Sequence, residues 1–315
     1  MDINYIILAH KNPAQLNRLV EVLSESWTKF YIHIDRNQHI APFQEKLKNQ
    51  KTTYFLEYQQ RESTIWGDIG IVKATLNALE QIIKDKRQGY CILLSGQDYP
   101  LRKNKVIRNH LFRNSGTIFM DLFQLPGGWQ KAGLDRIHNY KLNKSRGRGH
   151  FLQLPSMFDR DFYSRETAGK INFLRKTNRF KELRLVLKKR KFPNPLEPYG
   201  GSQWWALPME NIQQIIDFVA THPSYLQYHK YTLIPDEIFF HSIIVYLNKE
   251  NNQKIEPALT YLNWDRPKGP LPVTFVSPDL DELQIASKAK LFARKFDINK
   301  DEIILNLIDD YLRKE

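Results

Sequence analysis

Two adjacent carboxylates, Asp236 and Glu237, directly follow Pro235 and precede an apolar run that has the composition of a helix. Proline is favoured in the first turn of a helix, and the positive end of the helix dipole there stabilises an ionised carboxylate. Glu237 is therefore a candidate general base that stays charged at neutral pH. Acidic residues in a first turn are also ordinary helix-start chemistry, so this motif alone does not establish a catalytic site.

A second candidate site is the basic pair Arg294 and Lys295, which stands between Phe292 and Phe296. The aromatic neighbours should hold the aliphatic stems of both side chains against an apolar surface while the charged ends reach outward. Two cations in this arrangement would bind a diphosphate and offset the negative charge that grows as it leaves. A basic pair at such a position is more often plain protein surface.

The adjacent tryptophans Trp204 and Trp205 form a third candidate site, with Gln203 directly before them. An indole ring can stack on the apolar C–H face of a sugar, whose hydroxyls need polar partners such as the Gln203 amide. Tryptophan is also ordinary core material, so packing in the interior is the competing interpretation.

No metal site is expected. Hard divalent cations prefer carboxylate and phosphate oxygens, and a paired Asp-x-Asp at a strand end would supply them. The sequences Asp159-Arg160-Asp161 and Asp279-Leu280-Asp281 do not follow buried strands, and the arginine in the first would repel a divalent ion. The nine histidines show no close metal-ligand spacing.

The elements that must position these residues alternate between short β-branched or aromatic runs and helix-like stretches. Strands are predicted over residues 5–9, 30–34, 53–56, 90–94 and 117–120, and helices over 13–23 and 69–83. Alternation of this kind is typical of βα units and predicts an α/β fold with a mostly parallel sheet. In open sheets of this class, ligands lie beyond the carboxyl ends of the strands.

Polar residues follow the predicted strands at that edge. His10 follows the first strand, Asp35 and Arg36 follow the second, and Asp98 follows the fourth. We therefore expect a ligand cleft there. The chain has no Gly-x-Gly-x-x-Gly and no Gly-x-x-x-x-Gly-Lys-Ser/Thr motif, so side chains or a helix start must hold any phosphate.

Composition narrows the class of protein. The chain has 315 residues, a formal charge of +13 and 42% hydrophobic residues, so it can bury a substantial core and should favour acidic partners such as nucleotides or anionic lipids. The single cysteine, Cys91, excludes an intrachain disulfide and favours a reducing compartment. No apolar run approaches the roughly 20 residues needed to span a bilayer, which predicts a soluble or peripheral protein.

Two basic segments lie in the middle of the chain. Residues 141–148 are basic and contain glycine, which predicts a mobile surface loop, and residues 171–192 have the pattern of one basic amphipathic helix. The default interpretation of that helix is a solvated face on a core-packed helix. The alternative is contact with an anionic membrane surface, where each nearby Lys or Arg contributes about 1 kcal/mol.

The order and spacing of several short motifs resemble glycosyltransferase family 14, which comprises the core-2/I-branching β-1,6-N-acetylglucosaminyltransferases and the peptide O-xylosyltransferases. The similar segments are Ile7-Leu8-Ala9-His10, Tyr31-Ile32-His33-Ile34-Asp35-Arg36, Leu94-Ser95-Gly96-Gln97-Asp98-Tyr99-Pro100, Gly201-Ser202-Gln203-Trp204-Trp205, Pro235-Asp236-Glu237 and Phe292-Ala293-Arg294-Lys295-Phe296. The resemblance implies a GT-A fold, a UDP-sugar donor, inversion at the anomeric carbon and no requirement for a metal.

The resemblance also implies roles for single residues. Glu237 matches the glutamate that acts as the base, and Arg294 with Lys295 matches the basic pair that holds the diphosphate. Asp35 resembles the acid that meets the uridine, and Asp98 the acid at the donor-sugar edge of the cleft.

The chain departs from the animal members of this family in several respects. It lacks their paired cysteines and their signal-anchor and stem, which fits a bacterial-type cytoplasmic enzyme. The additional arginine of the branching enzymes has no clear counterpart, and either Arg294 or Arg266 would replace it. Gln203 stands where the xylosyltransferases carry an acid, so acceptor recognition should differ.

These observations predict one GT-A domain over residues 1–315, with a nucleotide-binding half at 1–125 and an acceptor-binding and catalytic half at 126–315. The expected reaction transfers N-acetylglucosamine or xylose from UDP to a glycan or a lipid-linked oligosaccharide, in the cytoplasm or at the inner face of the membrane, without a cofactor. Donor binding is assigned to His10, Asp35, Arg36, Asp98, Arg294 and Lys295, and acceptor binding to Gln203, Trp204, Trp205 and Asp236.

Two other functions are considered. A non-catalytic carbohydrate-binding protein would need only Trp204 and Trp205, but it leaves the acids at several strand ends unexplained. A nucleic-acid binder would account for the charge, but the sequence has neither a docking motif nor aromatic residues interleaved with basic ones on a predicted β surface. Nucleic acid is therefore not expected as a partner.

Overall fold

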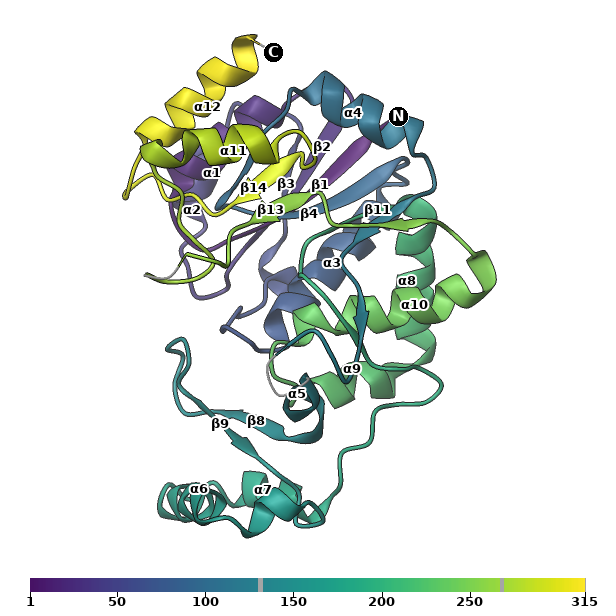
Figure 1. Cartoon of the computed structure of the whole chain (residues 1–315), viewed down its shortest axis with the longest axis vertical. Coiled ribbons are helices and arrows are strands. Elements are labelled where there is room, and N and C mark those ends of the chain that lie inside the picture. The colour runs from purple at the N-terminus through teal and green to yellow at the C-terminus, as the bar shows by residue number, and fades with distance from the viewer. Residues whose placement is uncertain (130–132, 267–268, 315) are drawn as a thin grey trace.

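A central sheet of seven strands organises the computed structural model, which describes residues 1–129, 133–266 and 269–314 (Figure 1). The strand order is β12-β6-β11-β4-β1-β2-β3. The strands are β1 (Ile3–Ala9), β2 (Thr28–Ile34), β3 (Thr53–Phe55), β4 (Tyr90–Ser95), β6 (Ile118–Met120), β11 (Trp205–Pro208) and β12 (Ile255–Glu256). Only β11 runs antiparallel to its neighbours, so the predicted α/β fold with a mostly parallel sheet is confirmed.

Helices cover both faces of this sheet. One face carries α1 (Pro13–Leu23), α2 (Ala41–Lys46), α4 (Asn104–Arg113), α11 (Leu280–Ala286) and α12 (Ile303–Lys314), and the other carries α3 (Gly70–Lys84), α8 (Met209–Thr221), α9 (Pro223–His229) and α10 (Phe239–Asn251). Strand β1 shows why both faces are filled. Its Tyr5 and Ile7 belong to the first core and the intervening Ile6 to the second, as the two-residue period of a strand requires.

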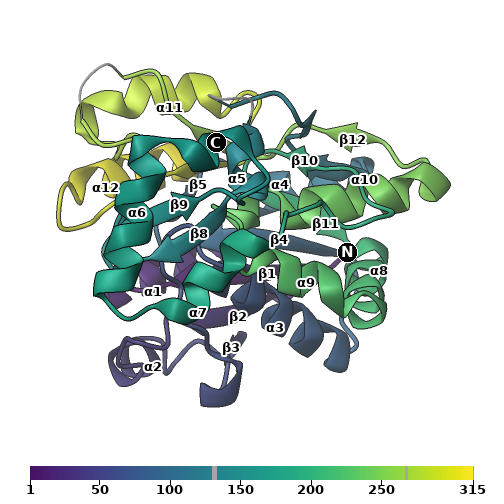
Figure 2. The same ribbon diagram turned by 90° about the horizontal axis from the view of Figure 1, so that it is seen from below.

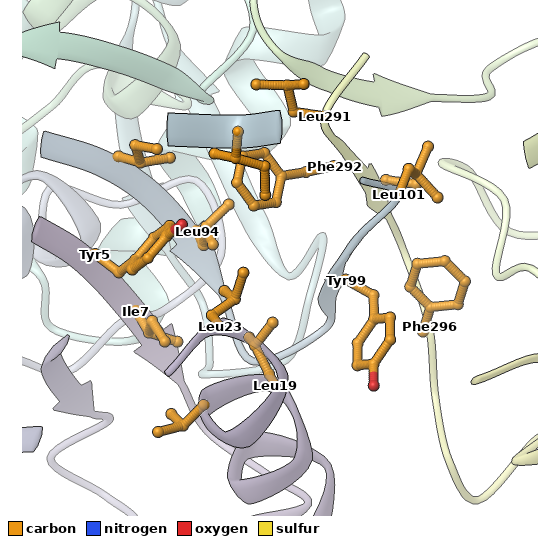
Figure 3. Packing of buried hydrophobic residues seen from close by; sticks show 14 of the residues in the cluster. Tyr5, Ile7, Leu19, Leu23, Leu94, Tyr99, Leu101, Leu291, Phe292 and Phe296 are labelled. Carbon is orange, nitrogen blue, oxygen red and sulfur yellow. The ribbon is translucent and has the colours of Figure 1, made fainter. Parts of the chain in front are cut away.

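A smaller sheet joins the C-terminal part of the chain to the first core. It contains β5 (Asp98–Pro100), β13 (Thr260–Leu262) and β14 (Phe292–Arg294), with β14 in the centre. Phe292 and Phe296 point into the core beside Tyr99, Leu101 and the apolar side chains of α1 (Figure 3). The aromatic residues on either side of the basic pair are thus buried.

A lobe formed by residues 139–192 extends from the lower end of the molecule in Figure 1, opposite the two termini. Its hairpin consists of β8 (Tyr140–Asn143) and β9 (Phe151–Leu154), and its helices are α6 (Arg165–Lys176) and α7 (Phe180–Leu183). A short helix, α5 (Leu134–His138), precedes the hairpin. The remaining pieces are the strand pair β7 (Phe123–Gln124) and β10 (Tyr199–Gly200), and 3-10 turns at Tyr58–Gln60, Arg160–Tyr163, Arg184–Leu187, Pro235–Glu237 and Ser277–Asp279.

The expectation for residues 141–148 holds only in part, because residues 144–148 form exposed bends and turns, and the expectation for residues 171–192 was wrong. Residues 141–148 are not simply a surface loop, because Lys141 lies in β8 with 3% of its surface exposed. Residues 171–192 are not one helix, because α6 ends at Lys176 and Asn178 adopts a left-handed conformation with φ of 56°. Arg190, expected on the solvated face, is buried and donates to the backbone oxygens of Asn139 and Tyr228.

The helix expected to begin at Pro235 also starts later than expected. Pro235–Glu237 is a 3-10 turn, and α10 starts at Phe239. Glu237 therefore precedes the helix instead of lying in its first turn. Within the described residues, no helix is long and apolar enough to cross a membrane.

Candidate functional site

A cavity of about 1200 Å³ lies beyond the carboxyl ends of β1, β2 and β4, where the sequence predicted a cleft. Segments far apart in the chain line it. Eight of the eleven predicted site residues reach its wall: His10, Asp35, Gln203, Trp204, Asp236, Glu237, Arg294 and Lys295. Arg36, Asp98 and Trp205 do not line it.

The turn that carries Glu237 is fixed to the rest of the site through its backbone. Ile234, at φ of 54°, donates its N–H to the carbonyl of Gly67 at 3.1 Å, and Gly201 donates to the carbonyl of Glu237 at 3.0 Å. A Cβ atom on Gly201 would stand 1.8 Å from the carbonyl oxygen of Asp121. Glycine is therefore required for this close approach, which explains why the sequence has Gly201 directly before the Trp204 segment.

The Glu237 carboxylate is paired and yet accessible from the cavity. Arg136 Nη1 donates to Glu237 Oε2 at 2.7 Å, and 23% of the Glu237 side chain remains exposed. The guanidinium of Arg136 in turn stacks on Trp129, at 3.6 Å from the ring centre. Burial raises the pKa of Glu237, and Arg136 opposes that rise, so the arginine favours the charged form that a base requires.

Asp236 lies beside Glu237 but in a drier environment. It is 5% exposed, and its Oδ1 atom has no hydrogen-bond partner among the described residues. Burial and the neighbouring Glu237 charge raise the pKa of Asp236 to about 7. The nearby Lys141 has its Nζ 3.8 Å from Asp68 Oδ1. Burial lowers the pKa of Lys141, and the charges of Asp68 and Asp236 oppose that change.

At the other end of the cavity, antiparallel pairing of β14 with β5 places Arg294 opposite Asp98. Arg294 Nη1 donates to Asp98 Oδ1 at 2.8 Å and also to the Ser95 hydroxyl. Asp98 is fully buried and accepts two further bonds from Ser95, so it cannot contact a donor sugar as predicted. Its role is to hold Arg294.

Trp204 covers the other side of the Arg294 guanidinium. The carbon of that group lies 4.6 Å from the centre of the indole ring. Because Arg294 occupies this face of Trp204, the predicted stacking of a sugar on the same face is not available. Arg294 is thus held between a buried carboxylate and an aromatic ring.

Further cations line the cavity near this arginine. Burial lowers the pKa of Lys295, and the charges of Arg294, Arg148 and Lys11 lower it further. Mutual repulsion of this kind shows that several positive charges share one space, which an anion would relieve. Lys11 is paired with Asp297 at 2.6 Å.

Arg148 comes from the β8–β9 loop, and sequence reasoning did not assign it to the site. Its guanidinium carbon lies 5.2 Å from the centre of the Trp66 ring. Arg266, which the resemblance offered as an additional phosphate ligand, instead pairs with Asp279 at 2.8 Å and does not line the cavity. Arg148 is the better placed third cation.

The carboxylate of Asp35 is fixed at the end of β2. Its Oδ1 accepts from the backbone N–H of Asn37 at 2.8 Å and its Oδ2 from the backbone N–H of Thr64 at 2.7 Å. The side chains of both neighbours also donate to it, and these bonds together lower the pKa of Asp35. Beside it, burial lowers the pKa of His10 and favours the neutral imidazole.

Two predicted site residues lie elsewhere. Trp205 is 2% exposed and packs on Phe240 in the second core, because consecutive residues of an extended chain point to opposite sides. Its assignment to acceptor binding is therefore wrong. Arg36 is exposed and lies over Tyr58 at 4.7 Å from the ring centre, outside the cavity, so its assignment to donor binding is not supported.

No cluster of metal ligands accompanies this site. Within the parts of the chain that the structure describes, no three His, Cys, Asp or Glu side chains are grouped so that they could hold a metal ion.

Comparisons with known proteins give consistent results. The sequence profile of the family described as Core-2/I-Branching enzyme matches residues 3–287. Rat xylosyltransferase 1 is 23% identical over 342 residues, which cover 98% of this chain and 35% of the rat protein. Human xylosyltransferase 2 is 23% identical over 336 residues, which cover 98% of this chain and 33% of the human protein. The chain thus spans about a third of the length of these relatives.

Proposed function

The chain belongs to the Core-2/I-branching enzyme family, and from this premise we propose that it is an inverting glycosyltransferase with a UDP-sugar as donor. The observation that carries the proposal is that Glu237 shares one cavity with Arg294, Lys295 and Arg148. One wall thus offers a carboxylate and another offers fixed positive charge. A transfer reaction needs a base for the acceptor and a cationic partner for the departing diphosphate.

The reaction is a single displacement. Glu237 takes the proton from an acceptor hydroxyl while the oxygen attacks the anomeric carbon, and the bond from that carbon to the UDP oxygen breaks on the opposite face. The charge that develops on the diphosphate is met by Arg294 and Lys295. General base help is worth roughly 10²–10⁴ in rate and one positioned donor roughly 10²–10³, so both groups are needed.

Fixed cations replace a metal ion in this proposal. Arg294 is held by Asp98 and Trp204, so its charge is in place before the donor binds. Preorganised charge of this kind stabilises a leaving group without reorganisation during the reaction. The enzyme therefore needs no divalent cation.

The nucleoside and the acceptor occupy opposite parts of the cavity. Neutral His10 and the fixed Asp35 carboxylate offer hydrogen bonds to the uridine at the ends of β1 and β2. Gln203 and Asp236 are the polar groups beside Glu237 and serve the acceptor, which is a glycan or a glycolipid. The donor sugar is N-acetylglucosamine or xylose.

The carbohydrate-binding alternative loses its basis. That function required the rings of both tryptophans to be available for stacking on a sugar. However, Trp205 is buried in the core, and the guanidinium of Arg294 lies over one face of the Trp204 ring.

The first experiment incubates the purified chain with a panel of UDP-sugars and measures the release of UDP, with and without short oligosaccharide acceptors. We expect UDP-N-acetylglucosamine or UDP-xylose to be consumed faster than the other donors, and faster still with an acceptor. Turnover of CMP-sugars or GDP-sugars, with no turnover of any UDP-sugar, would contradict the assigned donor class.

The cationic wall has its own test in UDP binding. Lys295→Ala should weaken the affinity for UDP by about tenfold, because one unscreened cation of the diphosphate contact is lost. Isothermal titration calorimetry with UDP measures this. The matched control is Lys51→Ala, an exposed lysine far from the cavity. Equal affinities of the two variants would remove Lys295 from the donor site.

A further inference from the structure

A strongly basic surface lies outside the cavity, in residues 158–191, which we call the basic lobe. These residues contain twelve Lys and Arg but only four Asp and Glu, so they carry a formal charge of +8 out of +13 for the whole chain. One of the cations, Arg190, is buried and binds backbone oxygens. The others lie on or near the surface of the lobe.

Most of this charge is not neutralised within the lobe. The ion pairs found there are Lys170–Glu166, Arg179–Glu182 and Lys189–Asp159. Exposed cations without a carboxylate within 4.0 Å, among the described residues, are Arg160, Arg165, Arg175, Lys176, Lys181, Arg184, Lys188 and Lys191. Such a surface needs an anionic partner to lower its own repulsion.

The basic lobe also exposes large apolar side chains. Phe158, Tyr163, Phe180 and Leu187 are 61%, 75%, 53% and 59% exposed. They are four of the nine exposed large hydrophobic residues among the described part of the chain, although the lobe is a small fraction of it. An isolated exposed apolar residue needs no explanation, but a concentration of them in one charged region marks an interaction surface.

The position of the lobe relates it to the cavity. In Figure 2, which views the molecule from below, α6 and α7 lie in front of the hairpin and the sheet. The small core beneath them joins Leu174 and Val186 to Tyr140 and Leu152 of the hairpin. The loop of the same hairpin supplies Arg148 to the cavity wall. The basic lobe therefore packs on the hairpin whose loop reaches the cavity wall.

We propose that the basic lobe docks on an anionic lipid bilayer. Lys and Arg side chains are drawn to anionic headgroups, and Phe, Tyr and Leu side chains insert at the boundary between headgroups and acyl chains. Nucleic acid would satisfy the charge and its bases would stack on the exposed aromatic rings, but it offers no partner to the exposed Leu187. The docked lobe would hold the cavity near the membrane surface, where, on the proposed function, a lipid-linked glycan presents its sugars.

Vesicle binding tests this surface directly with the full chain. We expect the protein to sediment with vesicles of phosphatidylcholine and phosphatidylglycerol, and not with vesicles of phosphatidylcholine alone. Replacing Arg175, Lys176, Lys181 and Lys188 by Gln should lower the partition coefficient by up to roughly 600-fold, since each charge near the surface contributes about fivefold. Release of UDP with a water-soluble acceptor should not change, because none of these residues lines the cavity.

The matched control removes the same number of charges from the nucleotide-binding half, by changing the exposed residues Lys46, Lys51, Lys84 and Lys105 to Gln. Equal loss of binding in both variants would show a general effect of net charge and overturn the proposal. The proposal would also be overturned if the protein bound neutral and anionic vesicles equally. It would be overturned as well if the full chain retained labelled RNA but did not bind vesicles. Vesicle binding is measured without donor or acceptor, so its failure would leave the proposed transfer reaction untouched.

Discussion

Two carboxylate–arginine pairs contribute to one cavity, and their acids differ in burial. Asp98 and Arg294 are joined at 2.8 Å, and Glu237 and Arg136 at 2.7 Å. The two arginines are similarly accessible, with 20% and 16% of their side chains exposed. The acids differ, because Asp98 is completely buried whereas Glu237 keeps 23% of its side chain exposed.

The surroundings of each acid explain this difference. Asp98 accepts bonds from the Ser95 backbone, the Ser95 hydroxyl and Arg294, so its oxygens are committed within the protein. Glu237 has Arg136 as its side-chain partner and faces the cavity. The same pair chemistry therefore yields a fixed cation at one end and an accessible base at the other, depending on which partner is buried.

The largest effect should come from removing the base. Glu237→Gln keeps the shape of the side chain but cannot take a proton at neutral pH, so kcat should fall roughly 10²–10⁴-fold. Affinity for UDP should remain within a small factor, because the glutamate lies apart from the cations that hold the diphosphate. Steady-state rates and calorimetry measure the two quantities. Near-normal turnover would remove Glu237 from the reaction.

Replacing the buried acid Asp98 should lower the free energy of unfolding. Asp98→Asn leaves Arg294 without its buried counter-charge, and breaking such a pair destabilises the fold by about 3 kcal/mol or more. Urea unfolding measures this loss. Glu237→Gln, at a partly exposed pair, should cost no more than about 1 kcal/mol. Equal losses of unfolding free energy in the two variants would mean that burial does not distinguish the pairs.

The part of the cavity at the ends of β1 and β2 could be predicted from sequence because local patterns determine it. The apolar runs of β1, β2 and β4 are long enough to be recognised, and parallel strands bring the residues after them to one edge. Asp35 and His10 therefore appear where the pattern placed them. Burial of single side chains was not predictable in the same way, as Asp98 and Trp205 show.

The other side depends on contacts across long sequence separations. Arg136 comes from a helix of five residues, and its partner Glu237 lies 101 positions later. Lys141 and Arg148 belong to a hairpin whose basic and glycine-containing sequence also fits an open loop. No local periodicity in the sequence predicts that these cations point toward the interior and the cavity. Only the packing of the hairpin against Asp68 and Trp66 reveals them.

A smaller effect should appear in the pH profile when Arg136 is replaced. Arg136 lowers the pKa of Glu237 against the effect of burial, so Arg136→Gln should raise that pKa. The base is active when ionised, and the acid limb of kcat/KM should therefore move to higher pH. The nearby charged groups Asp236 and Lys141 are the same in the unmodified protein and in the Arg136→Gln variant. They therefore do not cancel the change in the pKa of Glu237. A limb that stays in place or moves to lower pH would contradict the role of Arg136.

The smallest expected effect is that of a chelator. A metal-dependent site at the end of β4 would need free carboxylates there, but the one acid present, Asp98, is committed to Arg294. The charge that a divalent ion would supply is already provided by Arg294, Lys295 and Arg148 around the cavity. We therefore expect the initial rate of UDP release to be the same in EDTA and in Mn²⁺. A rate that EDTA abolishes and Mn²⁺ restores would show that the fixed cations do not suffice, and the buried Asp98–Arg294 pair would lose its proposed purpose.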